Sequence, residues 1–116
     1  MSVANAKTNV MRLLDGWKMP YTAHECDGAE GLSGVEIAAK MGYDPACMFK
    51  TLVTVGESRK HYVFIIPVAV ELNLKKAARA SGEKNIAMVR SAELLPLTGY
   101  IHGGCSPIGM KKAFAT

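Results

Sequence analysis

Two stretches of β-branched and aromatic residues, separated by a polar turn, constrain the fold most strongly. Met48–Val55 and Tyr62–Val70 are rich in Val, Ile, Thr and aromatic side chains, and Gly56–Arg59 between them has the glycine and polar residues of a hairpin turn. Pro67 comes late in the second stretch, where it predicts a strand end or a bulge, because proline cannot donate a hydrogen bond to a neighbouring strand. The sequence therefore predicts a β-hairpin at the centre of the chain.

Helical signals lie on both sides of this hairpin. Apolar residues recur at helical spacing near the start of the chain, Ser33 with Glu36 forms a capping box, and Asp44-Pro45 is typical of a short helical turn. We predict helices at residues 10–16, 35–42 and 74–81, a helical turn from Ser91 that Pro96 limits, and further strands at Tyr21–Cys26 and Ile86–Arg90. Because helices and strands mix without a regular βαβ alternation, the predicted fold class is α+β with a mixed sheet.

The composition indicates one soluble globular domain. The 116 residues are 49% apolar and 21% charged, which excludes a disordered chain. No continuous apolar run approaches the roughly 20 residues of a membrane-spanning helix, and no signal-peptide pattern opens the chain. The net charge of +4 fits an anionic partner, although solubility alone also explains it.

The cysteines and histidines form no recognisable metal or disulfide pattern. Cys26, Cys47 and Cys105 include no C-x-x-C pair, and three free thiols fit a reducing cytoplasm. The three histidines lack the spacing of metal ligands, although His102 lies beside a glycine-rich segment where it could contact a substrate. We therefore expect no metal, no cofactor and a cytoplasmic location.

Lys50 is the only charged residue in the first predicted strand. Side chains alternate across a strand, so Lys50 shares a face with Leu52 and Thr54 and lies among mostly apolar neighbours. Lysine is rarely buried without a partner. Lys50 is therefore either an edge-strand lysine that prevents aggregation or a cation that points into a pocket, and the residues alone leave both alternatives open.

A glycine-rich segment follows the last predicted helical turn. Residues 98–109 contain four glycines within eleven positions, and glycine lets backbone N–H groups approach a ligand and form an anion-binding concavity. Lys111 and Lys112 follow and add positive charge. A nucleotide-hydrolysing P-loop is excluded, because Met110 stands where that motif needs lysine. A tight turn between strands is the alternative interpretation.

Three motifs occur in a specific order along nearly the whole chain. They are Lys50-Thr51-Leu52 after Met-Phe, Pro67-Val68-Ala69 before a Leu-Asn-Leu-Lys-Lys helix, and Leu97-Thr98-Gly99-Tyr100 leading to Gly103-Gly104-Cys105-Ser106-Pro107-Ile108-Gly109. Together they resemble the YbaK/EbsC family, which is related to the editing insertion domain of bacterial prolyl-tRNA synthetases. The resemblance implies an α+β domain with a mixed, barrel-like β-sheet flanked by helices.

The resemblance also implies a free-standing editing deacylase that hydrolyses the ester of mischarged tRNA, typically Cys-tRNA(Pro). The implied partner is the 3′ acceptor end of that tRNA, prolyl-tRNA synthetase is a second candidate partner, and a monomer or homodimer is expected. An ester is already activated, so amides of the glycine-rich segment are sufficient oxyanion donors and Lys50 is a fixed charge. The expected catalytic residues are Lys50, Gly104, Cys105 and Ser106, and the expected substrate-binding residues are Thr51, Tyr21, Cys26, Gly103, Pro107 and His102.

Two departures from the family affect these expectations. Cys26 stands where relatives often carry an aromatic residue lining the pocket, so the pocket wall is expected to be wider and the preferred amino acid stays open. We expect residues 1–116 to form one editing domain that lacks the C-terminal strands and helix of relatives, which leaves a sheet edge open.

Two other function classes compete with the enzyme. One is an inactive or truncated paralogue that binds aminoacyl-tRNA or a nucleotide without turnover. The other is a generic single-stranded nucleic-acid binder, for which the aromatic content of 7% is low.

Overall fold

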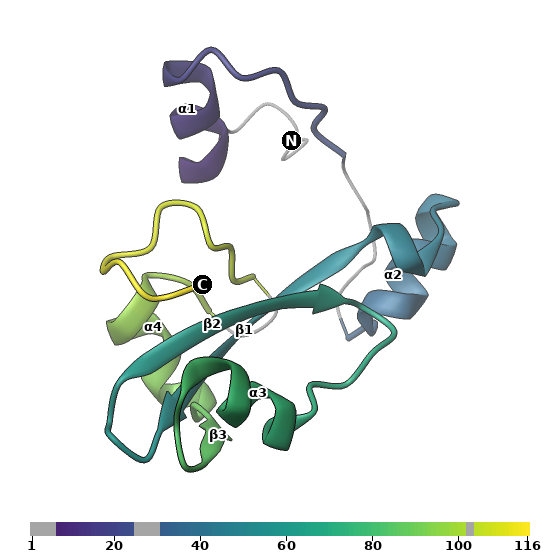
Figure 1. The fold of residues 1–116 in the computed structure, drawn as a ribbon. Coiled ribbons are helices and arrows are strands. Elements are labelled where there is room, and N and C mark those ends of the chain that lie inside the picture. The colour runs from purple at the N-terminus through teal and green to yellow at the C-terminus, as the bar shows by residue number, and fades with distance from the viewer. Residues whose placement is uncertain (1–6, 25–30, 102–103) are drawn as a thin grey trace.

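The computed structural model describes residues 7–24, 31–101 and 104–116 (Figure 1). The elements in these residues are α1 (Asn9–Gly16), α2 (Gly34–Met41), the 3₁₀ helix η2 (Pro45–Cys47), β1 (Phe49–Gly56), β2 (His61–Pro67), α3 (Leu74–Ser81), β3 (Ile86–Met88) and α4 (Ser91–Thr98). The predicted α+β class is confirmed. Each α-helix in the described ranges is only eight residues long, and none has the length and apolar character needed to cross a bilayer.

Local hydrogen bonds fix the predicted helix starts. Ser33 and Glu36 form the predicted capping box at the start of α2. The Asn73 side chain accepts a hydrogen bond from Lys76 N at the start of α3, and Asp44 caps η2 in the same way. These side chains satisfy N–H groups that the first helical turn leaves unpaired, which is why the sequence reveals them.

The described strands form one antiparallel sheet in the order β2–β1–β3. β1 pairs with β2 along nearly its whole length, and Lys50 lies opposite Ile66. β3 pairs only with Thr54–Gly56 at the end of β1. The edge of β1 from residue 49 to residue 52 therefore has no strand beside it in the part of the chain that the structure describes.

The prediction of a mixed, barrel-like sheet is wrong for the described residues. β3 is only three residues long, and no described strand joins it back to β2, so the sheet stays open. All pairs between the described strands are antiparallel. The only parallel contact that the structure describes is an isolated bridge between Tyr62 and Ala115.

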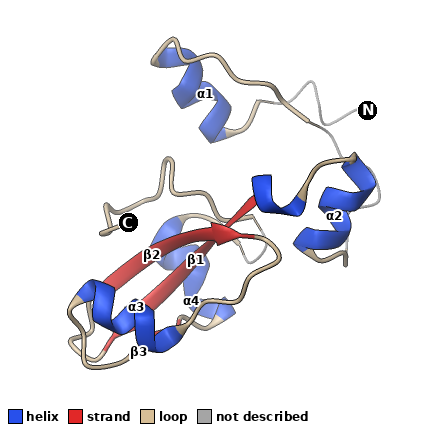
Figure 2. Ribbon diagram, turned by 45° about the vertical axis from the view of Figure 1, so that its right-hand side comes forward, coloured by secondary structure: helices blue, strands red, loops and turns tan. Residues whose placement is uncertain are grey.

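One helix covers each face of the sheet, as Figure 2 shows. On one face Val63 packs with Leu94 of α4, and on the other face Phe64 packs against Ala77 of α3. Val63 and Phe64 are neighbours in β2, so their side chains point to opposite faces. The hairpin is thus the middle layer between α3 and α4.

Glu83, in the loop between α3 and β3, holds the hairpin turn. One carboxylate oxygen accepts from Ser58 N at 3.1 Å, and the other accepts from Ser58 Oγ at 2.5 Å and from Tyr62 Oη at 2.6 Å. The hydrogen bonds from Ser58 and Tyr62 hold the pKa of Glu83 below its ordinary value, and the bond to Glu83 raises the pKa of Tyr62. The turn end of β1 is therefore connected directly to the α3–β3 loop.

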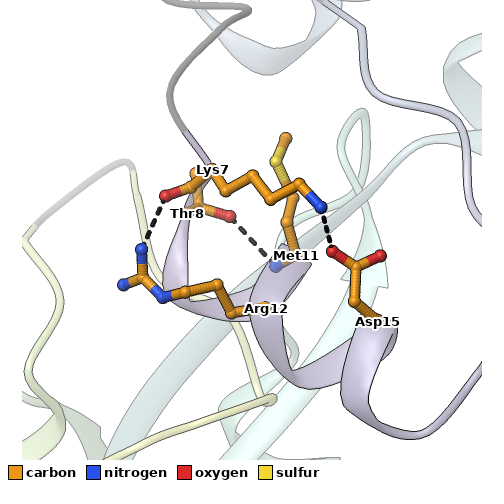
Figure 3. A network of polar contacts seen from close by, with 5 residues as sticks. All are labelled: Lys7, Thr8, Met11, Arg12 and Asp15. Atoms are coloured by element: carbon orange, nitrogen blue, oxygen red, sulfur yellow. Dashed lines mark hydrogen bonds and ion pairs between the residues drawn. The ribbon is translucent and has the colours of Figure 1, made fainter.

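Polar contacts along its own length hold α1, which lies apart from the sheet (Figure 3). The Lys7 ammonium donates to Asp15 at 2.5 Å, Thr8 Oγ1 accepts from Met11 N at 3.2 Å, and the Arg12 guanidinium donates to the Lys7 carbonyl at 3.0 Å. No residue of α1 is fully buried.

Some predicted boundaries are wrong. Tyr21–His24 is not a strand, and residues 25 and 26 of that prediction lie outside the described residues. β2 stops at Pro67, as the proline predicts, and Val70 N then bonds the Pro67 carbonyl at 3.1 Å in a turn. β3 ends at Met88, two residues before the predicted end at Arg90.

The helix α4 continues past Pro96 to Thr98, although the sequence predicts that Pro96 limits it. The proline removes the hydrogen bond to the carbonyl of Ala92, and Ala92 is exposed.

Candidate active site

A cavity of about 620 Å³ lies beside the part of β1 that β3 leaves uncovered. Its walls come from the start of α2, from β1, from the β3–α4 junction and from the glycine-rich segment. A space of this size accepts a small molecule or the end of a larger one. Much of its lining is aliphatic or thioether: Leu32, Ile37, Met48, Val68, Met88 and Leu94.

Lys50 is the only charged side chain among the described lining residues. It is partly buried, and no carboxylate in the described ranges pairs with it. The strand register puts it on the same face as Leu52, as alternation predicts. An uncompensated cation in a mostly apolar cavity attracts anionic or carbonyl oxygen, because the local dielectric is lower than that of water. The geometry therefore favours the pocket interpretation of Lys50 over the edge-strand one.

The cavity also reaches the backbone of β1. Val89 N donates to the Val53 carbonyl at 3.1 Å, so the backbone groups of Thr51 and Phe49, two and four residues earlier, point to the same edge. Lys50 and Thr51 lie on opposite faces of the strand, yet both line the cavity. The cavity therefore extends around the uncovered edge of β1, where the Thr51 backbone has no strand partner among the described residues.

Two helix amino termini border the cavity. Ser33 and Gly34 at the start of α2 line it, and so does Ser91 at the start of α4. Gly34 packs so closely that a Cβ there would lie 2.8 Å from Val68 Cβ. At α4 no side chain caps the first turn, so its unpaired N–H groups add partial positive charge to the cavity, whereas Ser33 and Glu36 already cap the start of α2.

The glycine-rich segment contributes Cys105 to the cavity. Burial raises the pKa of the Cys105 thiol, which is therefore protonated at neutral pH, and Sγ donates to the Ile101 carbonyl at 3.7 Å. Gly104 N donates to the same carbonyl at 3.0 Å, so the Gly104 amide is not the free oxyanion donor that the sequence predicts. Cys105 N and Ser106 N have no acceptor among the described residues, which leaves these two amides as the candidate donors.

Other predicted site residues are not part of the described lining. Ser106 Oγ accepts from Ile108 N at 3.1 Å and so shapes the turn, and Pro107 is exposed. Tyr21 is also exposed, and partial desolvation and a hydrogen bond with Asp15 of α1 raise its pKa, so its ring belongs to the α1 region. The predicted residues that lie outside the described residues are Cys26, His102 and Gly103.

Sequence reasoning misses the apolar walls and the helix starts of this site. The capping box of Ser33 and Glu36 reveals where α2 begins, but no local signal places that start beside Lys50. The lining residues extend from Leu32 to Cys105 along the chain and meet only in the folded protein.

Comparison with known proteins identifies the family. Residues 30–115 match the family described as the aminoacyl-tRNA editing domain. The chain belongs to this family. The predicted resemblance to YbaK/EbsC proteins is confirmed, since the chain is 48% identical over 111 residues to EbsC of Enterococcus faecalis, a candidate Cys-tRNA(Pro)/Cys-tRNA(Cys) deacylase. That match covers 95% of this chain and 68% of EbsC.

Two crystal structures are similar to this chain. One is of a protein described only as hypothetical, with a TM-score of 0.76 and 23% identity over 87% of this chain and 66% of that one, and it shows the shared fold. The other is of a candidate trans-editing enzyme for prolyl-tRNA synthetase, with a TM-score of 0.62 and 31% identity. This second match covers 69% of this chain and 50% of the other one.

Proposed function

We propose that this protein is an aminoacyl-tRNA deacylase that hydrolyses mischarged tRNA, with Cys-tRNA(Pro) as its main substrate. The observation that carries the proposal is the unpaired Lys50 cation in a mostly apolar cavity that Cys105 also lines, in a chain of the editing family. EbsC is described as a candidate Cys-tRNA(Pro)/Cys-tRNA(Cys) deacylase, and the other relative as a candidate trans-editing enzyme for prolyl-tRNA synthetase. Both descriptions support Cys-tRNA(Pro) as the substrate.

The proposed chemistry is attack of water on the aminoacyl ester. Water adds to the carbonyl carbon, the ester C–O bond then breaks, and the proton of the water passes to the ribose oxygen, which leaves a free amino acid and an uncharged tRNA. The amides of Cys105 and Ser106 donate to the oxyanion that forms on the carbonyl oxygen. Lys50 holds a phosphate, ribose or carbonyl oxygen in place as a fixed charge. An activated ester needs this positioning and no nucleophilic side chain.

Selectivity comes from the size of the cavity in this proposal. The side chain of the amino acid lies against the aliphatic wall, where one methylene changes the transition-state energy by about 1–3 kcal/mol. The protonated Cys105 thiol adds no charge to that wall, so a small, weakly polar side chain such as that of cysteine is accepted. Cysteine is also the substrate whose own thiol can assist its release.

The proposed partner is the 3′ acceptor end of mischarged tRNA, delivered in the cytoplasm where charged tRNA is used. Prolyl-tRNA synthetase is the proposed second partner, because one structural relative is a candidate trans-editing enzyme for that synthetase. The protein acts as a monomer or homodimer in this scheme.

Deacylation assays on three charged tRNAs test the proposal. We expect Cys-tRNA(Pro) to be hydrolysed faster than Ala-tRNA(Pro), and correctly charged Pro-tRNA(Pro) to be hydrolysed no faster than in buffer alone. Multiple turnovers on Cys-tRNA(Pro) exclude the alternative of a paralogue that only binds. A folded protein that binds Cys-tRNA(Pro) without accelerating its hydrolysis would overturn the enzyme and establish the binding function instead.

A further inference from the structure

Hydrogen bonds close the base of the glycine-rich segment. Thr98 is fully buried, and its hydroxyl donates to the Leu94 carbonyl at 2.8 Å and accepts from Tyr100 N at 3.0 Å. The Thr98 carbonyl accepts from Lys111 N at 3.0 Å. The two ends of the segment are thereby fixed to each other and to the last turn of α4.

Tyr100 adds a second connection across the glycine-rich segment, between the residues that Thr98 and Lys111 join. Its hydroxyl donates to the Ile108 carbonyl at 2.5 Å, across the segment that carries Cys105 and Ser106. Ile108 is also bonded on its other side, because Ile108 N donates to Ser106 Oγ at 3.1 Å. A chain of two hydrogen bonds thus runs from the Tyr100 hydroxyl through Ile108 to Ser106.

Helix α1 packs against the end of the glycine-rich segment at Gly109. Gly109 has φ +75°, and a Cβ there would lie 2.7 Å from Asn9 Nδ2, 2.8 Å from Leu13 Cδ1 and 3.3 Å from Tyr100 Oη. A side chain at Gly109 is therefore disfavoured by the left-handed backbone conformation, and it would also push the side-chain ends of Asn9 and Leu13 aside. The Tyr100 hydroxyl and the α1 side chains Asn9 and Leu13 therefore all lie around Gly109.

We propose that Tyr100 is a positioning residue for the deacylation, a role that rests on the proposed function. Its hydroxyl fixes Ile108, Ile108 fixes Ser106, and the amides of Cys105 and Ser106 are held in the direction that the developing oxyanion needs. Tyr100 does not touch the substrate. Preorganised donors are effective because they pay no reorganisation cost during the reaction, so a donor pair that moves loses rate even when the substrate still binds.

Tyr100→Phe tests this role, because it removes only the hydroxyl. We expect kcat for Cys-tRNA(Pro) to fall about tenfold, as the loss of one hydrogen bond that aligns a transition-state donor implies. We expect KM to change less than twofold, because Lys50 and the cavity walls stay in place. A Tyr100→Leu variant, which also removes the ring, should lose stability in addition.

Tyr62→Phe is the matched control. It removes a tyrosine hydroxyl that makes a hydrogen bond of 2.6 Å to Glu83, far from the glycine-rich segment in the chain and outside the described cavity lining. We expect Tyr62→Phe to lower the melting temperature and to leave kcat unchanged. Equal losses of kcat in the two variants, or a Tyr100→Phe kcat within twofold of wild type, overturn the positioning role.

NMR spectra of ¹⁵N-labelled wild type and variants test the same inference without activity. We expect the amide resonances of Cys105 and Ser106 to shift or broaden in Tyr100→Phe and to stay in place in Tyr62→Phe. If wild type has no deacylase activity, the proposed function fails, and these resonances still decide whether Tyr100 holds the two amides. Unchanged Cys105 and Ser106 resonances in Tyr100→Phe overturn the inference in either case.

Discussion

The two halves of β1 differ in what lies beside them. From Thr54 to Gly56 the strand pairs with β3, Val53 bonds Val89 just after β3, and β2 or the hairpin turn lies on the other edge. The carboxylate of Glu83 accepts hydrogen bonds from Ser58 in that turn. From Phe49 to Leu52 the strand has β2 alone, and the cavity takes the place of the third strand. One continuous strand is therefore structural at one end and forms the candidate site at the other.

This difference shows why Lys50 is tolerated. A lysine in the closed half would have to be buried between α3, α4 and β3 without a partner, which is costly. In the open half its charged group reaches a cavity, and the rigid half holds the backbone from which it projects. The expectation is that changes in the open half alter activity, whereas changes in the closed half alter stability.

The largest effect is expected from Lys50→Ala. Removing the cation should lower kcat/KM on Cys-tRNA(Pro) by about 100-fold, because a fixed charge that contacts the transition state is worth about as much as an oxyanion donor. The melting temperature should stay within about 2 °C of wild type, since no described partner loses an ion pair. Lys60→Ala, in the turn at the far end of the hairpin, is the matched control and should keep full activity. Retained activity in Lys50→Ala would place the chemistry elsewhere.

Val63→Ala should produce the largest loss of stability. Val63 is 2% exposed, packs in the core under α4 and does not line the described cavity at Lys50. Losing two buried methyl groups should lower the free energy of unfolding by about 2 kcal/mol in urea titrations. We expect kcat at a temperature well below the melting transition to match wild type. A variant of normal stability but low kcat would show that the two halves of the sheet are not separable.

A smaller, pH-dependent effect is expected from Glu83→Gln. The pKa of Glu83 lies below its ordinary value of 4.5, chiefly through hydrogen bonds from Ser58 and then Tyr62. Its contribution is therefore complete above pH 4.5 and is lost as the pH falls through the lowered folded value. We expect the variant to melt about 2–5 °C lower than wild type at pH 7 and the gap to shrink below pH 4.5. A gap that is constant down to acid pH would contradict the ionised hydrogen-bond network.

The smallest effect is expected from the exposed basic face of α3. Lys75, Lys76 and Arg79 are exposed, they lie opposite the buried Ala77 and Ala78, and no acidic side chain in the described ranges pairs with them. Changing all three to glutamate should raise KM for full-length tRNA about threefold and weaken its salt dependence. A short aminoacyl substrate that ends a few nucleotides from the 3′ terminus is the control and should be hydrolysed at the wild-type rate. An equal change on both substrates would place the effect in the cavity.

The sequence predicts those elements whose cause is local. The α3 boundaries follow from the Asn73 cap and the left-handed Gly82, and the end of β2 follows from Pro67. The end of α4 is harder to predict, because tolerance of Pro96 depends on whether the carbonyl that it leaves unpaired is exposed, which only the folded chain determines.

The candidate site is predictable only in part for the same reason. Lys50 stands out as a charge among apolar residues of a strand, and the glycines mark the segment that carries Cys105. The partner of the Gly104 amide, the place of Tyr21 beside α1 and the approach of α2 to β1 are tertiary contacts with no local signature. The sheet is open because β3 pairs only with the end of β1. β3 has three residues, and the amino-acid composition of so short a strand does not determine its register.

The most direct test of the account is an NMR titration of the ¹⁵N-labelled protein with a non-hydrolysable 3′-amide analogue of cysteinyl-adenosine. The account predicts that amide shifts concentrate in the open half of β1 at residues 49–53, at the start of α2 and at Cys105 and Ser106. The resonances of Val55, Gly56 and Ser58 should stay in place. Shifts confined to the hairpin turn or to the surface of α3, with none at Lys50, would contradict the claim that the uncovered half of β1 is where the substrate binds.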